Sequence, residues 1–255
     1  MERPGPATPP LPPWPEVDFA AYGAVTVETL PRIQALTGSF LTRNWTMIPH
    51  VTHNDDVDIT ELDRFRSAWN VAQPERKLSA LPFMIKAMVA AMKAYPRFNA
   101  SLDASGQKLT LKHYFHIGVA IDTPKGLLVG VVRDCDKKGV EQIGADILAL
   151  STKARARGLS MDEMSGGCMS ISALGGIGGT SFTPIVNAPE VAILGVTRSE
   201  WKPRRAADNG IDWRLMAPLS LSYDHRVING ADAARFVCHM GESLAQPAAL
   251  VDAVP

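Results

Sequence analysis

Apolar residues recur along this chain at two spacings, one typical of helices and the other typical of strands. Residues 29–44 carry apolar side chains at helical spacing, at positions Ile33, Leu36, Phe40 and Leu41. A second helix is expected to begin at a cap supplied by Asp58 or Thr60 and to run through Trp69. Further helices are predicted over residues 81–95, 139–157 and 231–244.

Short runs that are apolar throughout, or that alternate apolar and polar residues, predict the strands. They span residues 48–53, 109–113, 115–121, 127–132, 169–172, 191–196 and 215–222. The sequence from Thr123 to Gly126 is interpreted as a hairpin turn, and the sequence from Asn99 to Ser101 as a turn only. Strands interleaved with helices, with several hairpins, predict an α+β, mixed-sheet sandwich rather than a doubly wound parallel sheet.

The two ends of the chain differ in composition. The first 15 residues hold seven of the chain's 19 prolines, so residues 1–15 are predicted to be an extended, Pro-rich linker or arm. Residues 16–255 have the composition of a packed domain, with 46% apolar residues in the chain as a whole. We therefore expect one domain preceded by an arm.

Charge and cysteine content exclude several functions. Because 26 basic residues balance 26 acidic ones, we expect neither a nucleic-acid partner nor a membrane surface. No apolar run approaches the length of a membrane span. The N-terminus runs into prolines rather than an apolar stretch, so we expect no signal peptide. Three scattered cysteines indicate a reducing, cytoplasmic location. His50 and His53 would face opposite sides of a strand, so we expect no shared metal.

The segment from Leu219 to Phe236 carries the most informative chemistry. An apolar strand ends in Tyr-Asp-His-Arg, a short turn closed by Asn229 and Gly230 follows, and then a helix begins. A histidine at such a junction, His225, can point its ring into a cleft and act as a base. The other interpretation is a structural histidine that hydrogen-bonds to the backbone.

The motif SYDHRVINGADAARF resembles the signature of the 2-oxo acid dehydrogenase acyltransferases, the E2 components. Further matching stretches occur in the expected order, and together they cover about residues 17 to 251. They are IPHVTH, DITEL, IGVAIDTPKGLLV and GGCMSISALGGIGGTSFTPIVNAPEVAILGV. The resemblance implies the chloramphenicol acetyltransferase-like fold of an E2 catalytic core, which forms trimers.

The resemblance implies an acyltransferase that moves an acyl group, expected to be acetyl, between a dihydrolipoyl thioester and coenzyme A. His225 matches the family's general base, and Ser172 matches the serine whose hydroxyl stabilises the oxyanion. Full proton transfer from a thiol with a pKa near 8.5 to an imidazole with a pKa near 6.5 costs only about 2.7 kcal/mol. Coenzyme A contacts are carried over to Arg66, Ser79 and Asp122.

The family also implies the partners. Each active site is expected between two subunits, with His225 from one and Ser172 from its neighbour. The lipoyl group would come from a separate domain or chain, the E1 and E3 components would be further partners, and no metal is expected. The C-terminal residues offer only a small apolar hook, Leu250, Val251 and Val254, so we expect a homotrimer, with a cubic assembly as the alternative.

Two positions depart from the family pattern: Asn229 stands where most members have aspartate, and Gly130 where they usually have proline. These departures keep a second hypothesis open, a non-catalytic structural core of such a complex. A third hypothesis is O-acetyl transfer of the chloramphenicol type. That group usually has a second histidine before the catalytic one, whereas this chain has Asp224.

Overall fold

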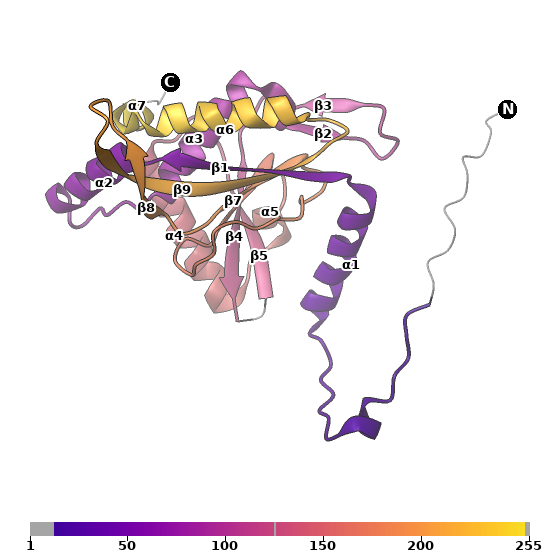
Figure 1. Cartoon of the computed structure of the whole chain (residues 1–255). Helices are drawn as coiled ribbons and strands as arrows, with labels where there is room; N and C mark the ends of the chain where they lie inside the picture. Colours follow the sequence, from indigo (N-terminus) through magenta and orange to yellow (C-terminus); the bar gives the residue numbers. More distant parts are fainter. Residues whose placement is uncertain (1–12, 125, 253–255) are drawn as a thin grey trace. The chain divides into compact units, whose positions relative to one another are not determined.

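The computed structural model describes residues 13–124 and 126–252 (Figure 1). These residues belong to two units, one that ends at Pro31 and one that begins at Arg32. In the first unit, a single 3-10 turn, Phe19–Tyr22, starts at Asp18, whose carboxylate accepts a hydrogen bond from the Ala20 amide (3.1 Å). Most of the predicted arm, residues 1–12, lies outside the described residues, so the domain boundary at residue 15 stays a prediction.

The second unit is built on a mixed, seven-stranded sheet. Its strand order is β1-β9-β7-β6-β4-β5, and β8 also pairs with β9. The pairs β4–β6 and β6–β7 are parallel, and the others are antiparallel. The strands are β1 (His50–Asp58), β4 (Ile117–Thr123), β5 (Gly126–Val132), β6 (Met169–Ala173), β7 (Ala192–Val196), β8 (Glu200–Arg205) and β9 (Ile211–Asp224). A separate pair consists of β2 (Ala100–Leu102) and β3 (Leu109–Leu111).

The helices that follow β1 in the chain cover one face of this sheet, whereas the helix before β1 buries only Asn44. The long helices are α1 (Arg32–Met47), α2 (Thr60–Ala72), α3 (Leu81–Ala94), α4 (Val140–Arg157) and α6 (Gly230–Leu244). The short ones are η2 (Pro96–Phe98), α5 (Met161–Met164) and α7 (Pro247–Asp252). Helix α3 packs between α4 and α6, α4 lies against β4 and β5, and α6 lies against β1 and β9 (Figure 1).

The core lies between that helix layer and the sheet. Helix α3 is apolar nearly all round, from Leu81 to Met92, and is accordingly buried on most of its surface. The second half of β9, from Met216 to Asp224, is buried at every position, and so is all of β7. A central strand buried on both faces can hold the turn that follows it in a fixed place.

The other face of the sheet carries small side chains and an irregular covering segment. Ser172, Gly195 and Ser220 lie level on the neighbouring strands β6, β7 and β9. The Phe182 ring lies directly on Gly195, because a Cβ atom there would be only 2.6 Å from Phe182 Cζ. Nearby, Val186 packs into a small apolar cluster with Ile48 and Ile193.

The predicted fold class, a mixed-sheet α+β sandwich, is confirmed. Residues 99–101 were predicted as a turn only, and this is wrong because Ala100–Leu102 pairs with β3 as a short strand. Gly130, which departs from the family pattern, lies within β5, where a Cβ would approach Leu159 Cδ1 to 3.0 Å.

The C-terminal segment packs on its own subunit as far as Asp252, where the described residues end. Leu250, expected to be part of an apolar hook, is 6% exposed and packs in the main core, and Val251 packs against the same core. Val254 lies outside the described residues. None of the helices within residues 13–124 and 126–252 is long and apolar enough to cross a membrane.

Candidate active site

His225 is the first residue after the buried strand β9 and lies exposed in the turn before α6. Its amide donates a hydrogen bond to the Pro49 carbonyl (3.1 Å), and its ring lies 5.9 Å from that of Tyr223. Among the described residues, the imidazole itself makes no hydrogen bond. Within the described part of the chain, both ring nitrogens are therefore open to a substrate that comes within hydrogen-bond reach, which is what a general base needs.

The residues on either side of His225 form an ion pair with each other. Asp224 is 2% exposed, and it accepts hydrogen bonds from the Arg226 amide (3.0 Å) and from the Arg226 guanidinium (2.6 Å from Nη2 to Oδ2). Because the carboxylate stabilises the guanidinium cation, it raises the pKa of Arg226. The pair closes the turn around His225. Sequence reasoning noted the Asp-His-Arg motif and missed this role, which the spacing of opposite charges two residues apart could have indicated.

Asn229 is the N-cap of α6. Its Oδ1 accepts a hydrogen bond from the Asp232 amide (2.9 Å), and its Nδ2 donates to the Asp232 carboxylate (2.7 Å). A side-chain-to-backbone hydrogen bond therefore holds the turn at the start of α6. Whether Asn229 takes part in catalysis stays a prediction.

Ser172 lies near the end of β6 and is partly exposed. Its side chain is on the sheet face opposite the helices, since its neighbour Ile171 belongs to the main core. Within the described residues its hydroxyl makes no hydrogen bond. The hydroxyl is thus available to a partner outside the subunit.

Ser172 and His225 do not meet within one subunit. Ser172 pairs with Gly195, which pairs with Ser220 on β9, so Ser172 is level with Ser220. His225 lies five residues beyond Ser220, which is roughly 15 Å further along the strand and about 10 Å across two strand spacings. A site that uses both side chains therefore needs two copies of the chain.

Arg66 and Ser79, two of the three predicted coenzyme A contacts, lie on the same side of the subunit. Asn70, one turn after Arg66 on α2, holds Leu78 by two hydrogen bonds, Leu78 N to Oδ1 (2.7 Å) and Nδ2 to Leu78 O (3.0 Å). Ser79 follows Leu78 directly, is exposed and lines a groove of about 680 Å³ beside α4. Arg66 is half-buried and forms an ion pair with Asp63 (2.6 Å).

Asp122, the third predicted contact, is exposed near the end of β4, opposite Leu127 of β5. No hydrogen bond or ion pair joins it to Arg66 or Ser79 within the part of the chain that the structure describes. All three contacts stay predictions.

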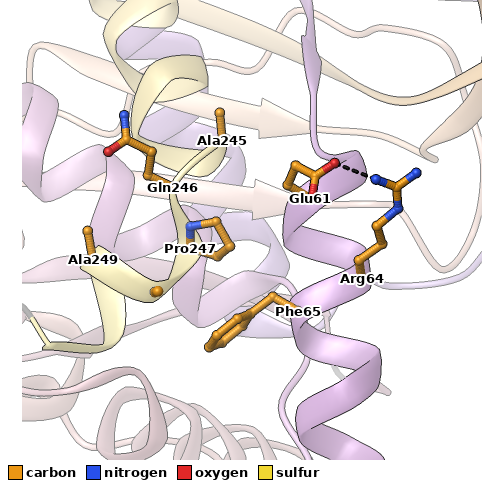
Figure 2. Close-up of a pocket in the computed structure, with 8 residues that line it drawn as sticks. Glu61, Arg64, Phe65, Ala245, Gln246, Pro247 and Ala249 are labelled. Atoms are coloured by element: carbon orange, nitrogen blue, oxygen red, sulfur yellow. Dashed lines mark hydrogen bonds and ion pairs between the residues drawn. The ribbon is translucent and has the colours of Figure 1, made fainter. Parts of the chain in front are cut away.

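A second groove, about 580 Å³ in volume, lies between α2 and the C-terminal segment, where Phe65 and Pro247 lie on facing sides (Figure 2). An ion pair between Glu61 and Arg64 lies at its rim (2.6 Å). None of the predicted site residues lines it. Among residues 13–124 and 126–252, no group of three or more His, Cys, Asp or Glu side chains is placed to hold a metal ion.

A buried carboxyl group, Glu190, lies two residues before β7. Burial raises its pKa to about 7, although the Lys112 ammonium opposes the shift. Its Oε2 has no hydrogen-bond partner among the described residues. No hydrogen bond or ion pair joins it to His225 among the described residues, so we give it no part in the proposed site.

Comparison with solved structures identifies the fold first. A chloramphenicol acetyltransferase shares it with a TM-score of 0.55 at 15% identity, over 80% of this chain and 94% of that one, which defines the fold class alone. The Azotobacter vinelandii dihydrolipoamide acetyltransferase (E2p) has a TM-score of 0.90 and 48% identity, over 94% of this chain and 99% of that one. A cubic core of the pyruvate dehydrogenase multienzyme complex has a TM-score of 0.90 and 49% identity, over 94% of this chain and 99% of that one.

The sequence comparisons then identify the family. Residues 22–251 match the family described as 2-oxoacid dehydrogenases acyltransferase (catalytic domain). The dihydrolipoyllysine-residue acetyltransferase component of the pyruvate dehydrogenase complex from Cupriavidus necator is 54% identical over 235 residues, which is 91% of this chain and 42% of the relative. The corresponding component from Haemophilus influenzae is 48% identical over 94% of this chain and 43% of its own length.

The chain belongs to the 2-oxoacid dehydrogenase acyltransferase family, as its sequence motifs predict. It spans about two fifths of the length of the curated relatives it matches. The match therefore covers the catalytic domain of those proteins.

Proposed function

We propose that this domain transfers an acetyl group between a dihydrolipoyl thioester and the thiol of coenzyme A. The observation that carries the proposal is His225, whose main chain is fixed at the end of a buried strand. Its imidazole is exposed and makes no hydrogen bond among the described residues. Membership of the family and relatives named as dihydrolipoyllysine-residue acetyltransferases support the same reaction.

The proposed reaction is an acyl exchange between two sulfur atoms. His225 takes the proton of the coenzyme A thiol as the sulfur attacks the thioester carbonyl, so one C–S bond forms and an oxyanion develops. The Ser172 hydroxyl of a neighbouring copy donates a hydrogen bond to that oxyanion. When the oxyanion collapses, the C–S bond to the dihydrolipoyl group breaks and the leaving sulfur takes the proton back from His225.

Asn229 supports this function rather than the non-catalytic alternative. The Azotobacter vinelandii structure was solved to investigate a serine, a histidine and an asparagine in the catalytic mechanism of that enzyme. Its asparagine follows its histidine by four positions, as Asn229 follows His225, and its serine precedes the histidine by 52 positions, against 53 here. An asparagine at this position is thus compatible with the chemistry.

The proposed assembly is a homotrimer with one site between each pair of neighbours. The separation of Ser172 from His225 within a subunit supports more than one copy per site. A cube of trimers is the alternative, favoured by the similar cubic core and disfavoured by the burial of Leu250 in its own subunit. We further propose lipoyl domains and E1 and E3 components as partners, and a cytoplasmic location, which suits the free thiols of Cys135, Cys168 and Cys238.

The test is a steady-state assay with acetyl-CoA and dihydrolipoamide, in which we expect formation of acetyl-dihydrolipoamide and free coenzyme A. Chloramphenicol in place of dihydrolipoamide should not be acetylated. A correctly assembled protein that acetylates neither acceptor would contradict the proposal and favour a structural core. Acetylation of chloramphenicol alone would favour O-acetyl transfer.

A further inference from the structure

We propose that His50 is a positioning residue that braces the His225 turn by holding the main chain of Val186. The effect that this brace has on turnover rests on the proposed function. The contacts themselves do not depend on it.

Two segments support the main chain at His225. On one side, the His225 amide donates to the Pro49 carbonyl, and His50 pairs with Asp224 at the start of β1. On the other side, the Asp224 amide donates to the Val191 carbonyl (2.9 Å). The position of His225 therefore depends on how these two supports lie relative to each other.

The His50 ring connects the first support to the segment that leads into the second. Its Nδ1 lies 2.8 Å from the Ile48 carbonyl, and its Nε2 lies 3.0 Å from the Val186 amide. A carbonyl only accepts and an amide N–H only donates, so Nδ1 carries the proton and Nε2 accepts. Both ring nitrogens are engaged, which leaves neither of them for a substrate and makes His50 a positioning residue rather than a base.

Val186 is the point at which the irregular segment before β7 is fixed. It is fully buried, and its carbonyl accepts a hydrogen bond from Asn44 Nδ2 (3.0 Å) while its amide donates to His50. Asn44 is itself 3% exposed. Side chains from α1 and β1 thus hold both the carbonyl and the amide of Val186. The segment at this point is not a strand, so these groups are not paired within the sheet.

The experiment compares His50→Gln with His50→Asn in the full-length chain. Glutamine places its amide oxygen near the position of Nε2 and can accept from Val186, whereas asparagine places its amide near Nδ1 and can donate only to Ile48. His53→Asn is the matched control, because it makes the same change on the same strand without touching Val186. The measurements are kcat, the KM for coenzyme A, and amide hydrogen exchange of the peptide that contains Val186.

We expect His50→Asn to lower kcat by at least about tenfold with little change in KM, because a small misplacement of the base slows the chemical step. His50→Gln should retain kcat within about threefold, since it keeps the bond to Val186. Exchange in the Val186 peptide should rise in the asparagine variant and stay near that of the native protein in the glutamine variant and in His53→Asn.

The proposed brace would be overturned if the two His50 variants had the same kcat and the same amide exchange. It would also be overturned if both variants lost kcat equally and in proportion to their loss of thermal stability. If the native protein transfers no acetyl group, the proposed function fails by itself. The exchange comparison then decides on the brace alone.

Discussion

His225 combines an exposed ring with a main chain fixed by the Pro49 and Val191 carbonyls, through its own amide and that of Asp224. Replacing it by alanine removes the proposed base and only a small apolar area. We expect His225→Ala to lower turnover by roughly 10²–10⁴ while the assembly remains intact. Steady-state rates at saturating coenzyme A, with light scattering on the same sample, measure both effects. A nearly native rate would show that another group takes the thiol proton.

Asn229 caps α6 through its side-chain oxygen, and its amide nitrogen donates to the Asp232 carboxylate. Asn229→Asp places two carboxylates together, but it keeps the oxygen that caps the helix. Because the cap is kept, we expect turnover to change less than about tenfold. Asn229→Ala removes the cap and should lose more activity. Asn229→Ser retains a capping oxygen without charge and serves as the control. A thousandfold gain in Asn229→Asp would show that the native chain lacks an essential carboxylate.

Glu190 should make stability depend on pH, because burial raises its folded-state pKa to about 7, whereas the pKa of an ordinary glutamate is 4.5. The neutral carboxyl of Glu190 contributes fully to the free energy of unfolding at low pH. This contribution is lost as the pH rises through 7. Between about pH 5 and pH 8, the native protein should therefore lose up to about 3 kcal/mol relative to Glu190→Gln. Urea unfolding of both proteins at several pH values measures this difference. Parallel curves would show that Glu190 is ionised in the fold.

The sequence predicted the place of a site residue well wherever one short segment determines that place. The Tyr-Asp-His-Arg strand end and the Asn-Gly turn placed His225 and Asn229 correctly at the start of α6. The separation of Ser172 from His225 could not be predicted from residue patterns alone, because it depends on the register of three strands. The Val186 contacts were missed because they join residues more than 130 positions apart.

At the scale of elements, long periodic segments were predicted well and short or charged ones were not. Helix α4 covers residues 140–157, against a prediction of 139–157. Strand β8 was missed because Glu200–Arg205 is mostly charged, contains a proline and is largely exposed. Strand β2 and helix α5, with three and four residues, are too short for a periodic pattern to appear.

The sheet face that carries Ser172 depends on the contact between Gly195 and Phe182. Gly195→Ala would place a methyl group 2.6 Å from the Phe182 ring, and we expect it to destabilise the fold by about 1–3 kcal/mol. Gly176→Ala is the matched control, since nothing lies within 4 Å of its Cβ position. Urea unfolding compares the variants, and Gly195→Ala combined with Phe182→Leu should recover part of the loss. Equal stability of the two alanine variants would contradict this packing.

At the scale of the whole molecule, the separation of Ser172 and His225 predicts complementation between inactive proteins. Neither His225→Ala nor Ser172→Ala should be active alone, Ser172→Ala losing roughly 10²–10³ in turnover. In mixed assemblies, a subunit that keeps His225 can meet a neighbour that keeps Ser172. Random mixing at equal amounts should restore about a quarter of the native activity, because half of the subunits supply each group.

The complementation assay requires dissociation and reassembly of the mixture, and the two separately reassembled variants are its controls. If the mixture is no more active than the average of its components while native protein recovers fully, both groups act within one subunit. That result would contradict the proposed shared site.

The long strand β9 also has a consequence for how subunits must be joined. In the proposed shared site, each copy carries two unlike half-sites, one beside Ser172 and the other at His225. Copies joined half-site to half-site in an open row would leave one unused half-site at each end, and the row could go on growing. Closure into a ring uses every half-site and stops growth. The number of complete sites then equals the number of subunits. Dilution that separates the assembly into single subunits should therefore abolish turnover at the same concentration at which the assembly dissociates.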